Sequence, residues 1–362
     1  MSSSAAHHSL STSAPTDEVT YISMFSTIGW AWADGHRLFR TTDGGKKWQQ
    51  IALPDGATSS EPLATSASSV WVIAQVKGKR ESFVSFDGGA TWRGGGVAPS
   101  GAGFAAAQGS YAWIQSSSGA AMGSDAGAVL WRSSDYGVSW SKVDTSTVGN
   151  SWIAIGEDAG QGMSFLNSTN GFIYGLSTAE GFSFLFQTHD GGRSWHHVAL
   201  NIPNRSASSI KVGEPMFSGN RGLLATWFGN VSRVQLWQSQ NGGQSWALTG
   251  TSAASFVYWP APPGSGPCVS VSVCWLEDVG SGGPTKLTVT TNAGQTWRTV
   301  AIPAAVRASF APANLGVGPE FDPVSGSVAW VLAHRSSTLW KTTDEGAQWQ
   351  QVPFTIEPGG AG

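Results

Sequence analysis

Thr41–Trp48 reads TTDGGKKW, and six later stretches repeat its pattern: Ser or Thr, any residue, Asp or Asn, any residue, Gly, any two residues, Trp. The pattern returns at Ser85–Trp92, Ser133–Trp140, Thr188–Trp195, Ser239–Trp246, Thr290–Trp297 and Thr342–Trp349. Successive copies lie 44 to 55 residues apart, counted between their Asp or Asn positions. One four-stranded blade of a β-propeller has this length, so the repeat predicts an all-β, seven-bladed propeller.

The Asp or Asn of each octapeptide is predicted to form a turn. Asp and Asn side chains accept hydrogen bonds from backbone amides a few residues on, and the Gly suits a site with positive φ. The Trp begins the next strand and offers a large apolar face for packing. A catalytic site is built once, whereas these residues recur seven times. We therefore interpret the following residues as structural: Asp43, Asp87, Asp135, Asp190, Asn241, Asn292 and Asp344.

The residues before each octapeptide complete the blade. An alternating run such as Leu38–Asp43 (LFRTTD) predicts the third strand, and an apolar run such as Gly29–Ala33 (GWAWA) predicts the second. The first and fourth strands are expected at positions such as Tyr21–Phe25 and Trp48–Leu53. Because each blade then contains its own four antiparallel strands, we expect the ring to close without strand exchange. The expected blades are 19–60, 61–100, 101–148, 149–203, 204–252, 253–305 and 306–356, between a disordered leader (1–18) and a flexible tail (357–362).

These octapeptides resemble the Asp box, or bacterial neuraminidase repeat, of a propeller superfamily. That superfamily includes sialidases, sortilin-type receptors, xyloglucanases and photosystem II assembly-factor propellers. The GWAWA-like second strands and TTDGGKKW-type boxes, over residues from about 19 to 356, are most similar to the photosystem II assembly-factor-like branch. The resemblance implies the fold, and for that branch chaperoning of a membrane-complex subunit. It does not specify a function, because the superfamily mixes hydrolases, receptors and scaffolds.

Composition excludes several classes of function. A formal net charge of −3 gives no support for a nucleic-acid partner. The sequence has no run of 18 apolar residues, so no transmembrane segment is expected. The leader (MSSSAAHHSLSTSAPTDE) does not have the pattern of a signal peptide. We expect a monomer with no cofactor and no metal.

The two cysteines indicate the compartment. Cys268 and Cys274 flank a predicted tight turn between the first and second strands of blade 6, which would bring them within bridging range. Two buried free thiols are the alternative, and a zinc site is disfavoured because no other Cys and no nearby His exist. We favour a disulfide, which predicts an extracytoplasmic protein: secreted, periplasmic or on the cell surface. The chain itself contains no recognisable export signal.

Candidate binding residues lie in loops on the rim opposite the octapeptides. Of the 19 tryptophans, Trp152 and Trp259 are the two that the blade repeat does not explain, and Tyr258 adjoins Trp259. Exposed aromatic residues in such loops would stack on sugars or anchor a protein, or else cover the end of their own blade. Basic residues fall on the consecutive blades 7, 1 and 2: His334, Arg335, His36, Arg37, Lys77, Lys79 and Arg80. Acidic residues fall on blades 4 to 6: Glu157, Asp158, Glu180, Glu214, Glu277 and Asp278. Such a charge asymmetry would orient a charged partner, although solvated loop charges without a role are the common alternative.

Enzyme chemistry finds little support in the residues. A sialidase-like site needs a Tyr nucleophile beside a Glu, and Tyr258, the one tyrosine expected in these loops, has no Glu near it in sequence. A xyloglucanase-like site needs two carboxylates facing a cleft, and no spacing selects a pair among Glu157, Glu214 and Glu277. No Gly-x-Ser-x-Gly elbow in a strand–helix context indicates a serine hydrolase. The sequence therefore favours a non-enzymatic binding propeller with a protein or glycan partner, with a glycoside hydrolase as the alternative.

Overall fold

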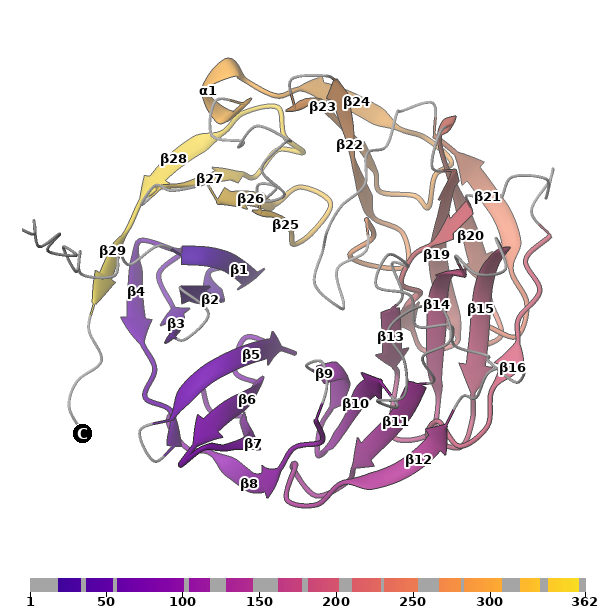
Figure 1. Cartoon of the computed structure of the whole chain (residues 1–362). Helices are drawn as coiled ribbons and strands as arrows, with labels where there is room; N and C mark the ends of the chain where they lie inside the picture. The colour runs from indigo at the N-terminus through magenta and orange to yellow at the C-terminus, as the bar shows by residue number, and fades with distance from the viewer. Residues whose placement is uncertain are drawn as a thin grey trace, which may run out of the picture.

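The computed structural model is a ring of seven β-sheets (Figure 1). It describes residues 19–33, 37–54, 57–100, 104–117, 128–145, 162–177, 182–201, 210–228, 231–252, 267–280, 283–307, 320–332 and 338–357. The expected all-β propeller of seven antiparallel four-stranded blades is confirmed. One short helix, α1 (Ala304–Arg307), follows the sixth blade.

Strands occupy four successive positions in each blade, from the centre of the ring outward, except that the described residues of blade 6 form no first strand. The first are β1 (Val19–Phe25), β5 (Thr58–Ala64), β9 (Phe104–Gln108), β13 (Gly162–Phe165), β17 (Ile210–Val212) with β18 (Met216–Ser218), and β25 (Glu320–Pro323). The second are β2 (Ile28–Ala33), β6 (Val70–Val76), β10 (Tyr111–Ser117), β14 (Gly171–Ser177), β19 (Arg221–Phe228), β22 (Cys274–Gly280) and β26 (Ala329–Leu332). The third are β3 (Arg37–Thr41), β7 (Lys79–Ser85), β11 (Ala128–Ser133), β15 (Phe182–Thr188), β20 (Val231–Ser239), β23 (Gly283–Thr290) and β27 (Thr338–Thr342). The fourth are β4 (Lys47–Gln50), β8 (Arg93–Val97), β12 (Ser141–Thr145), β16 (His196–His197), β21 (Ala247–Thr251), β24 (Arg298–Ala301) and β28 (Gln350–Pro353).

Packing between blades explains the apolar second strands. In β6, six of the seven residues are buried, because each blade lies between two neighbours and both of its faces are covered. Among the described residues, buried apolar side chains form seven clusters, one at each seam between adjacent blades. Several second-strand tryptophans also donate an indole hydrogen bond to the following blade. Trp30 Nε1 lies 2.9 Å from Ser66 O, and Trp275 Nε1 lies 2.8 Å from Ser325 O.

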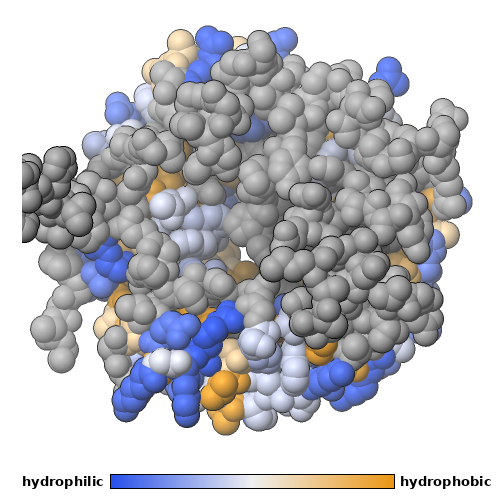
Figure 2. Space-filling model, viewed as in Figure 1, coloured by the Kyte–Doolittle hydropathy of each residue, from blue (hydrophilic) through white to orange (hydrophobic). Residues whose placement is uncertain are grey.

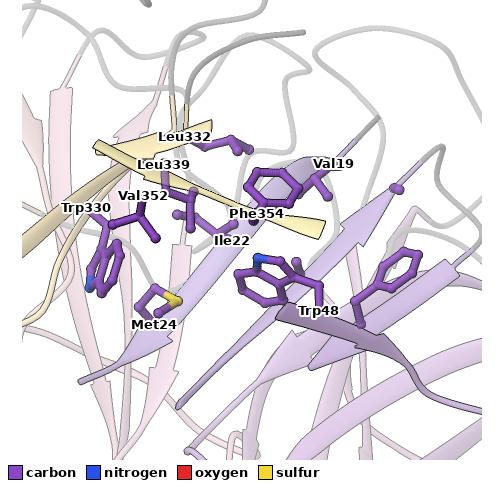
Figure 3. Packing of buried hydrophobic residues seen from close by; sticks show 12 residues of the cluster. Val19, Ile22, Met24, Trp48, Trp330, Leu332, Leu339, Val352 and Phe354 are labelled. Atoms are coloured by element: carbon purple, nitrogen blue, oxygen red, sulfur yellow. The ribbon is translucent and has the colours of Figure 1, made fainter. Parts of the chain in front are cut away.

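The seam between blades 7 and 1 closes the ring, and here the expectation of no strand exchange is wrong. A last strand, β29 (Thr355–Glu357), leaves blade 7 and pairs in parallel with β4 at the outer edge of blade 1. Phe354 connects β28 to β29 and is buried edge-on to Trp48, with ring centroids 6.5 Å apart. Figure 3 shows Val19, Ile22 and Met24 of blade 1 directed toward the side chains of blade 7. Closure therefore combines an apolar cluster with a strand that crosses the seam.

Blade 6 departs from the four-stranded plan. Its sheet contains β22, β23 and β24, and the position of the first strand is taken by an isolated bridge between Cys268 and Cys274. The Trp275 amide donates to Pro267 O at 2.7 Å, which extends this contact by one more hydrogen bond. Residues 267 and 268 therefore pair with the first two residues of β22 at the inner edge of this sheet.

Candidate functional site

The seven octapeptides form the turns between third and fourth strands, on one rim of the ring. In the first of them, the Thr41 hydroxyl donates to Asp43 Oδ1 at 2.9 Å and accepts from the Gly45 amide at 3.0 Å. The other six turns repeat the bond from the Gly amide to the hydroxyl at 2.8–3.0 Å. All seven hydroxyl residues are at most 1% exposed. The repeated turn therefore has one geometry with a buried hydroxyl at its centre.

The acidic residues of these turns are engaged inside the turns. Thr91 donates to Asp87 from its hydroxyl and its backbone amide, and these bonds lower the pKa of Asp87 to about 2. For Asp190, burial acts to raise the pKa, but hydrogen bonds from Ser194 and its neighbours outweigh it and lower the pKa to about 2. Such carboxylates stay ionised near neutral pH, which does not suit a general acid. No group of three or more metal-ligating residues occurs in the described part of the chain.

The opposite rim carries a tight basic hairpin between β6 and β7. Val76 pairs with Lys79, so Lys77 and Gly78 form a two-residue turn with φ of 49° and 80°. Two positive φ values are typical of the tight turns that join twisted strands. Lys77 and Lys79 are exposed, and neither has an anionic partner among the residues that the structure describes. Figure 2 shows strongly hydrophilic side chains over the part of the ring where Figure 1 places β6 and β7.

The two arginines predicted for this site are less exposed than the lysines. Arg37 begins β3, and its guanidinium lies over the Phe39 ring, 5.7 Å from the centroid. Arg80 follows Lys79 in β7, and its carbonyl accepts from the Ala98 amide at 2.9 Å. Both side chains are half-buried. Arg37, Lys79 and Arg80 therefore belong to one rim, and Lys79 is the most accessible of the three.

The remaining predicted binding residues lie outside the described residues. They are His36, Trp152, Tyr258, Trp259, His334 and Arg335. Of the acidic residues expected on this rim, Glu157, Asp158 and Glu180 also lie outside the described residues. The roles of all these residues therefore stay predictions.

Glu277 is not the solvated loop charge that the sequence analysis expects. It lies within β22 and is only 6% exposed, and burial raises its pKa to about 8. The alternation of the strand explains this position, because Glu277 shares a face with Trp275, whose ring is buried against blade 7. A carboxyl group with this pKa is mostly neutral near pH 7, so it adds little negative potential to the rim.

Two further carboxyl groups near the inner strands have raised pKa values. Glu214 lies between β17 and β18, and burial raises its pKa to about 7. Asp322 lies in β25, where burial raises its pKa to about 7 although the Met24 amide donates to its Oδ2. The bond between Asp322 and Met24 joins blade 7 to blade 1. The sequence analysis does not single out Asp322. Its position within an innermost strand is the feature that could have indicated a buried carboxyl group.

The structure brings one tyrosine near a glutamate. Tyr174 in β14 is buried, and burial, followed by the charge of Glu214, raises its pKa well above its usual value. A nucleophilic tyrosine needs easier ionisation, so this pair has the wrong electrostatics for sialidase-like attack. At this position the described residues therefore provide a tyrosine whose ionisation is made harder, not easier.

Cys268 and Cys274 form a disulfide, with Cα atoms 3.9 Å apart. Both residues are buried, at 4% and 0% exposure, in the apolar cluster between blades 5 and 6. The bridge ties the inner segment of blade 6 to β22, at the position where a first strand is missing.

Comparison with known proteins agrees with the architecture. No protein-family model matches the chain, and no curated protein matches it. A solved structure of YCF48 bound to a D1 peptide is 15% identical, with a TM-score of 0.51 over 91% of this chain and 94% of that one. A prolyl endopeptidase structure is 11% identical, with a TM-score of 0.56 over 94% of this chain and 51% of that one. The GH74 xyloglucanase from Xanthomonas campestris is 17% identical, with a TM-score of 0.49 over 93% and 54% of the two chains.

In the described part of the chain, no helix has the length and apolar character needed to span a bilayer. At these identities the likeness to solved structures concerns the fold alone. The chain is a seven-bladed β-propeller.

Proposed function

We propose that this chain is a non-enzymatic binding propeller that presents the rim opposite its octapeptide turns to a protein partner. The observation that carries the proposal is the β6–β7 hairpin, where Lys77 and Lys79 are exposed on a tight turn. A two-residue turn between paired strands has little backbone freedom to lose on binding, so its charges are held close to one arrangement for a partner. The YCF48 structure contains a bound D1 peptide, which is a precedent for peptide binding by this fold.

The partner surface next to the hairpin is proposed to be acidic. Two uncompensated ammonium groups at one tip favour an anionic surface and speed its approach. Arg37 and Arg80 lie in the strands beside these lysines, and His36, His334 and Arg335 are proposed to extend the same basic area. Trp152, Tyr258 and Trp259 are proposed as apolar anchors, so that Trp152→Ala or Trp259→Ala weakens binding by about 2 kcal/mol.

Photo-cross-linking tests the binding face. A photoreactive residue at position 77 should capture one partner protein from the native membrane-protein fraction, and the same residue at Lys142 should not. Lys142 is an exposed matched control, because it follows the octapeptide turn Ser133–Trp140 on the other rim. Capture from position 142 alone, or binding on a glycan array without any protein partner, would contradict the proposal.

We further propose that the protein works outside the cytoplasm. The Cys268–Cys274 disulfide supports this location, because such bonds persist mainly in oxidising compartments. Intact mass after alkylation without reductant, on protein from its native source, should show no modified thiols. Two alkylated cysteines would instead indicate a reducing compartment.

A glycoside hydrolase is the alternative, and Glu277 is the residue that would favour it. Its raised pKa resembles that of a general acid, but the residue is only 6% exposed, and a glycosidase carboxyl group has to reach the substrate. We therefore expect no turnover of chromogenic glycosides. Turnover that disappears in Glu277→Gln while the melting temperature is kept would replace the binding proposal by the hydrolase.

A further inference from the structure

Blade 6 differs from the other six blades at its inner edge. In those blades a first strand pairs with the second strand, whereas in blade 6 the described residues form only the bridge between Cys268 and Cys274 and one adjoining hydrogen bond. From Leu276 to Gly280, no described residue pairs with β22 on this side. β22 is the strand of blade 6 nearest the centre of the ring (Figure 1). In the described part of the chain, β22 is therefore the one second strand whose inner edge is mostly unpaired.

The register at the bridge shows which backbone groups of β22 point inward. The Trp275 amide donates to Pro267 O at 2.7 Å, so the backbone groups of Trp275 face the inner edge. Hydrogen-bonding groups alternate along a strand, so the amide and the carbonyl of Glu277 face the same edge. Glu277 is a buried residue, and buried backbone groups without a partner cost free energy. Glu277 thus presents one donor and one acceptor that a further strand would pair.

The sequence that precedes the bridge is poorly suited to this edge. It reads PPGSGP at 262–267, with three prolines and two glycines. In the register of the bridge, Pro267 and Pro263 fall at positions where a first strand donates to β22, and proline has no amide hydrogen. The prolines of two other first strands, Pro62 and Pro323, fall at the alternate positions, whose amides point away from the second strand. Residues 262–267 therefore match their second strand less well than the first strands of blades 2 and 7 do.

The side chain of Glu277 adds a specific feature to this edge. The carboxyl group is buried, its Oε1 has no hydrogen-bond partner, and no described basic residue pairs with it. Trp275, on the same face of β22, packs against Phe321 and Val331 of blade 7, so the surroundings are apolar. On an added strand, the residue opposite Glu277 would have its Cβ about 5 Å away. A Lys or Arg side chain there would supply the donor and the charge that the seam lacks.

Strand addition already occurs in this ring. β29 adds three residues to the outer edge of β4. The first strands of the other blades are three to seven residues long, so the unpaired length of β22 from Leu276 to Gly280 suits a strand of ordinary size. In complexes formed by strand addition, main-chain hydrogen bonds provide affinity and alternate side chains provide specificity.

We propose that the inner edge of β22 binds an extended segment of a protein partner, which completes blade 6 and places a Lys or Arg side chain opposite Glu277. This inference rests on the proposed function, because it takes the partner to be a protein. β22 ends at the same rim as β6, and Figure 1 shows these two strands on different sides of the ring. A basic segment at blade 6 and an acidic surface at Lys77 and Lys79 would together fix the orientation of the partner.

Amide hydrogen exchange in the full-length chain without partner tests whether the edge is open. The Glu277 amide should exchange at least about tenfold faster than the Leu276 amide, which faces β23. Trp330 is the matched control, because its amide faces the paired first strand β25 and should be protected. Equal protection of Glu277 and Trp330 would show that the chain itself fills this edge. That result would overturn the inference and leave the proposed function standing.

Peptide binding tests the specificity of the edge. The probe is the acetylated and amidated peptide Thr-Thr-Val-Lys-Val, and its control has norleucine in place of Lys. The Lys peptide should bind about tenfold more tightly than the norleucine peptide, and it should slow exchange at Glu277 but not at Trp330. The two peptides should bind equally to Glu277→Gln, whose melting temperature checks the fold.

Two results would overturn the inference: exchange at Glu277 that neither peptide slows, and a preference for the Lys peptide that Glu277→Gln retains. Because the first comparison of peptides uses the wild-type chain, it stands even where the variant does not fold. Peptide binding at Glu277 together with failed capture from position 77 would support the inference and contradict the hairpin as the binding face.

Discussion

Backbone conformation and packing constrain glycines separately, as Gly45 of an octapeptide turn and Gly78 of the β6–β7 hairpin show. Gly45 and Gly78 have almost the same φ, 78° and 80°. A Cβ on Gly45 would lie 2.5 Å from Leu339 Cδ1 across the seam between blades 7 and 1, whereas a Cβ on Gly78 would meet no atom within 4 Å. The backbone conformation constrains both residues, and the packing of the ring constrains only Gly45.

We predict that Gly78→Ala costs about 1 kcal/mol of unfolding free energy, from backbone strain alone. Gly45→Ala should cost about 2–4 kcal/mol, because overpacking at the seam adds to the same strain. Urea denaturation of both variants measures the difference. Equal losses of unfolding free energy in the two variants would show that the side chains at the seam between blades 7 and 1 accommodate the added methyl group.

Burial of Glu277 predicts a dependence of stability on pH. Its pKa is raised from 4.5 to about 8, so the folded state holds this proton more tightly than the unfolded chain does. The resulting stabilisation is complete below about pH 4.5 and is lost as the pH rises through about 8. The pKa values of Glu214 and Asp322 are raised to about 7, so these two groups change the unfolding free energy in the same direction. The unfolding free energy should therefore fall from about pH 4.5 to about pH 8, and fall less steeply in Glu277→Gln. Identical slopes in the two proteins would mean that Glu277 is ionised in the fold.

At the scale of the element, β29 is the part of the structure that joins the end of the chain to its first blade. Ile356 packs against the closing cluster, Glu357 pairs with Lys47 at 3.0 Å, and the Thr355 amide donates to Lys46 O. The ion pair is exposed and contributes little, so the ladder and Ile356 provide most of the stabilisation.

Removal of residues 355–362 should therefore lower the unfolding free energy by about 2 kcal/mol. It should also speed hydrogen exchange in β4 and β1. Removal of residues 358–362 alone is the matched control and should change neither quantity. Unchanged exchange in β4 after the longer truncation would show that β29 does not hold the seam.

Sequence predicted the repeated elements well, because each octapeptide specifies a turn through local chemistry and each apolar run specifies a buried strand. It did not predict β29, because three residues have no periodicity and their partner β4 lies about 300 residues away. The charge of Glu277 suggests a solvated loop, and this prediction is wrong. Alternation along β22 places the side chain on the same face as Trp275, where it is buried. The Cys268–Cys274 bridge was predictable because a six-residue separation across a turn limits where the sulfur atoms lie.

At the scale of the whole molecule, the ring separates its two rims by chemistry. At the octapeptide rim, the Ser or Thr hydroxyl of each turn accepts a hydrogen bond from the Gly amide of the same turn, and this bond repeats from blade to blade. The hairpin rim presents Lys77 and Lys79 without anionic partners among the described residues. Exposed basic residues such as Lys142 and Arg221 also lie at the octapeptide rim, so the proposed choice of rim depends on the tight turn that holds Lys77 and Lys79 and not on charge alone.

The rate of association with the cross-linked partner tests this account most directly. At low salt, Lys77→Glu/Lys79→Glu should slow association about tenfold and leave dissociation almost unchanged, because these charges act on approach. Lys142→Glu/Arg221→Glu carries the same change in charge on exposed residues beside the octapeptide rim, and should associate at the wild-type rate. Equal slowing by both variants would mean that net charge alone guides the partner. Slowing by the Lys142/Arg221 variant alone would place the binding face on the octapeptide rim and contradict the account.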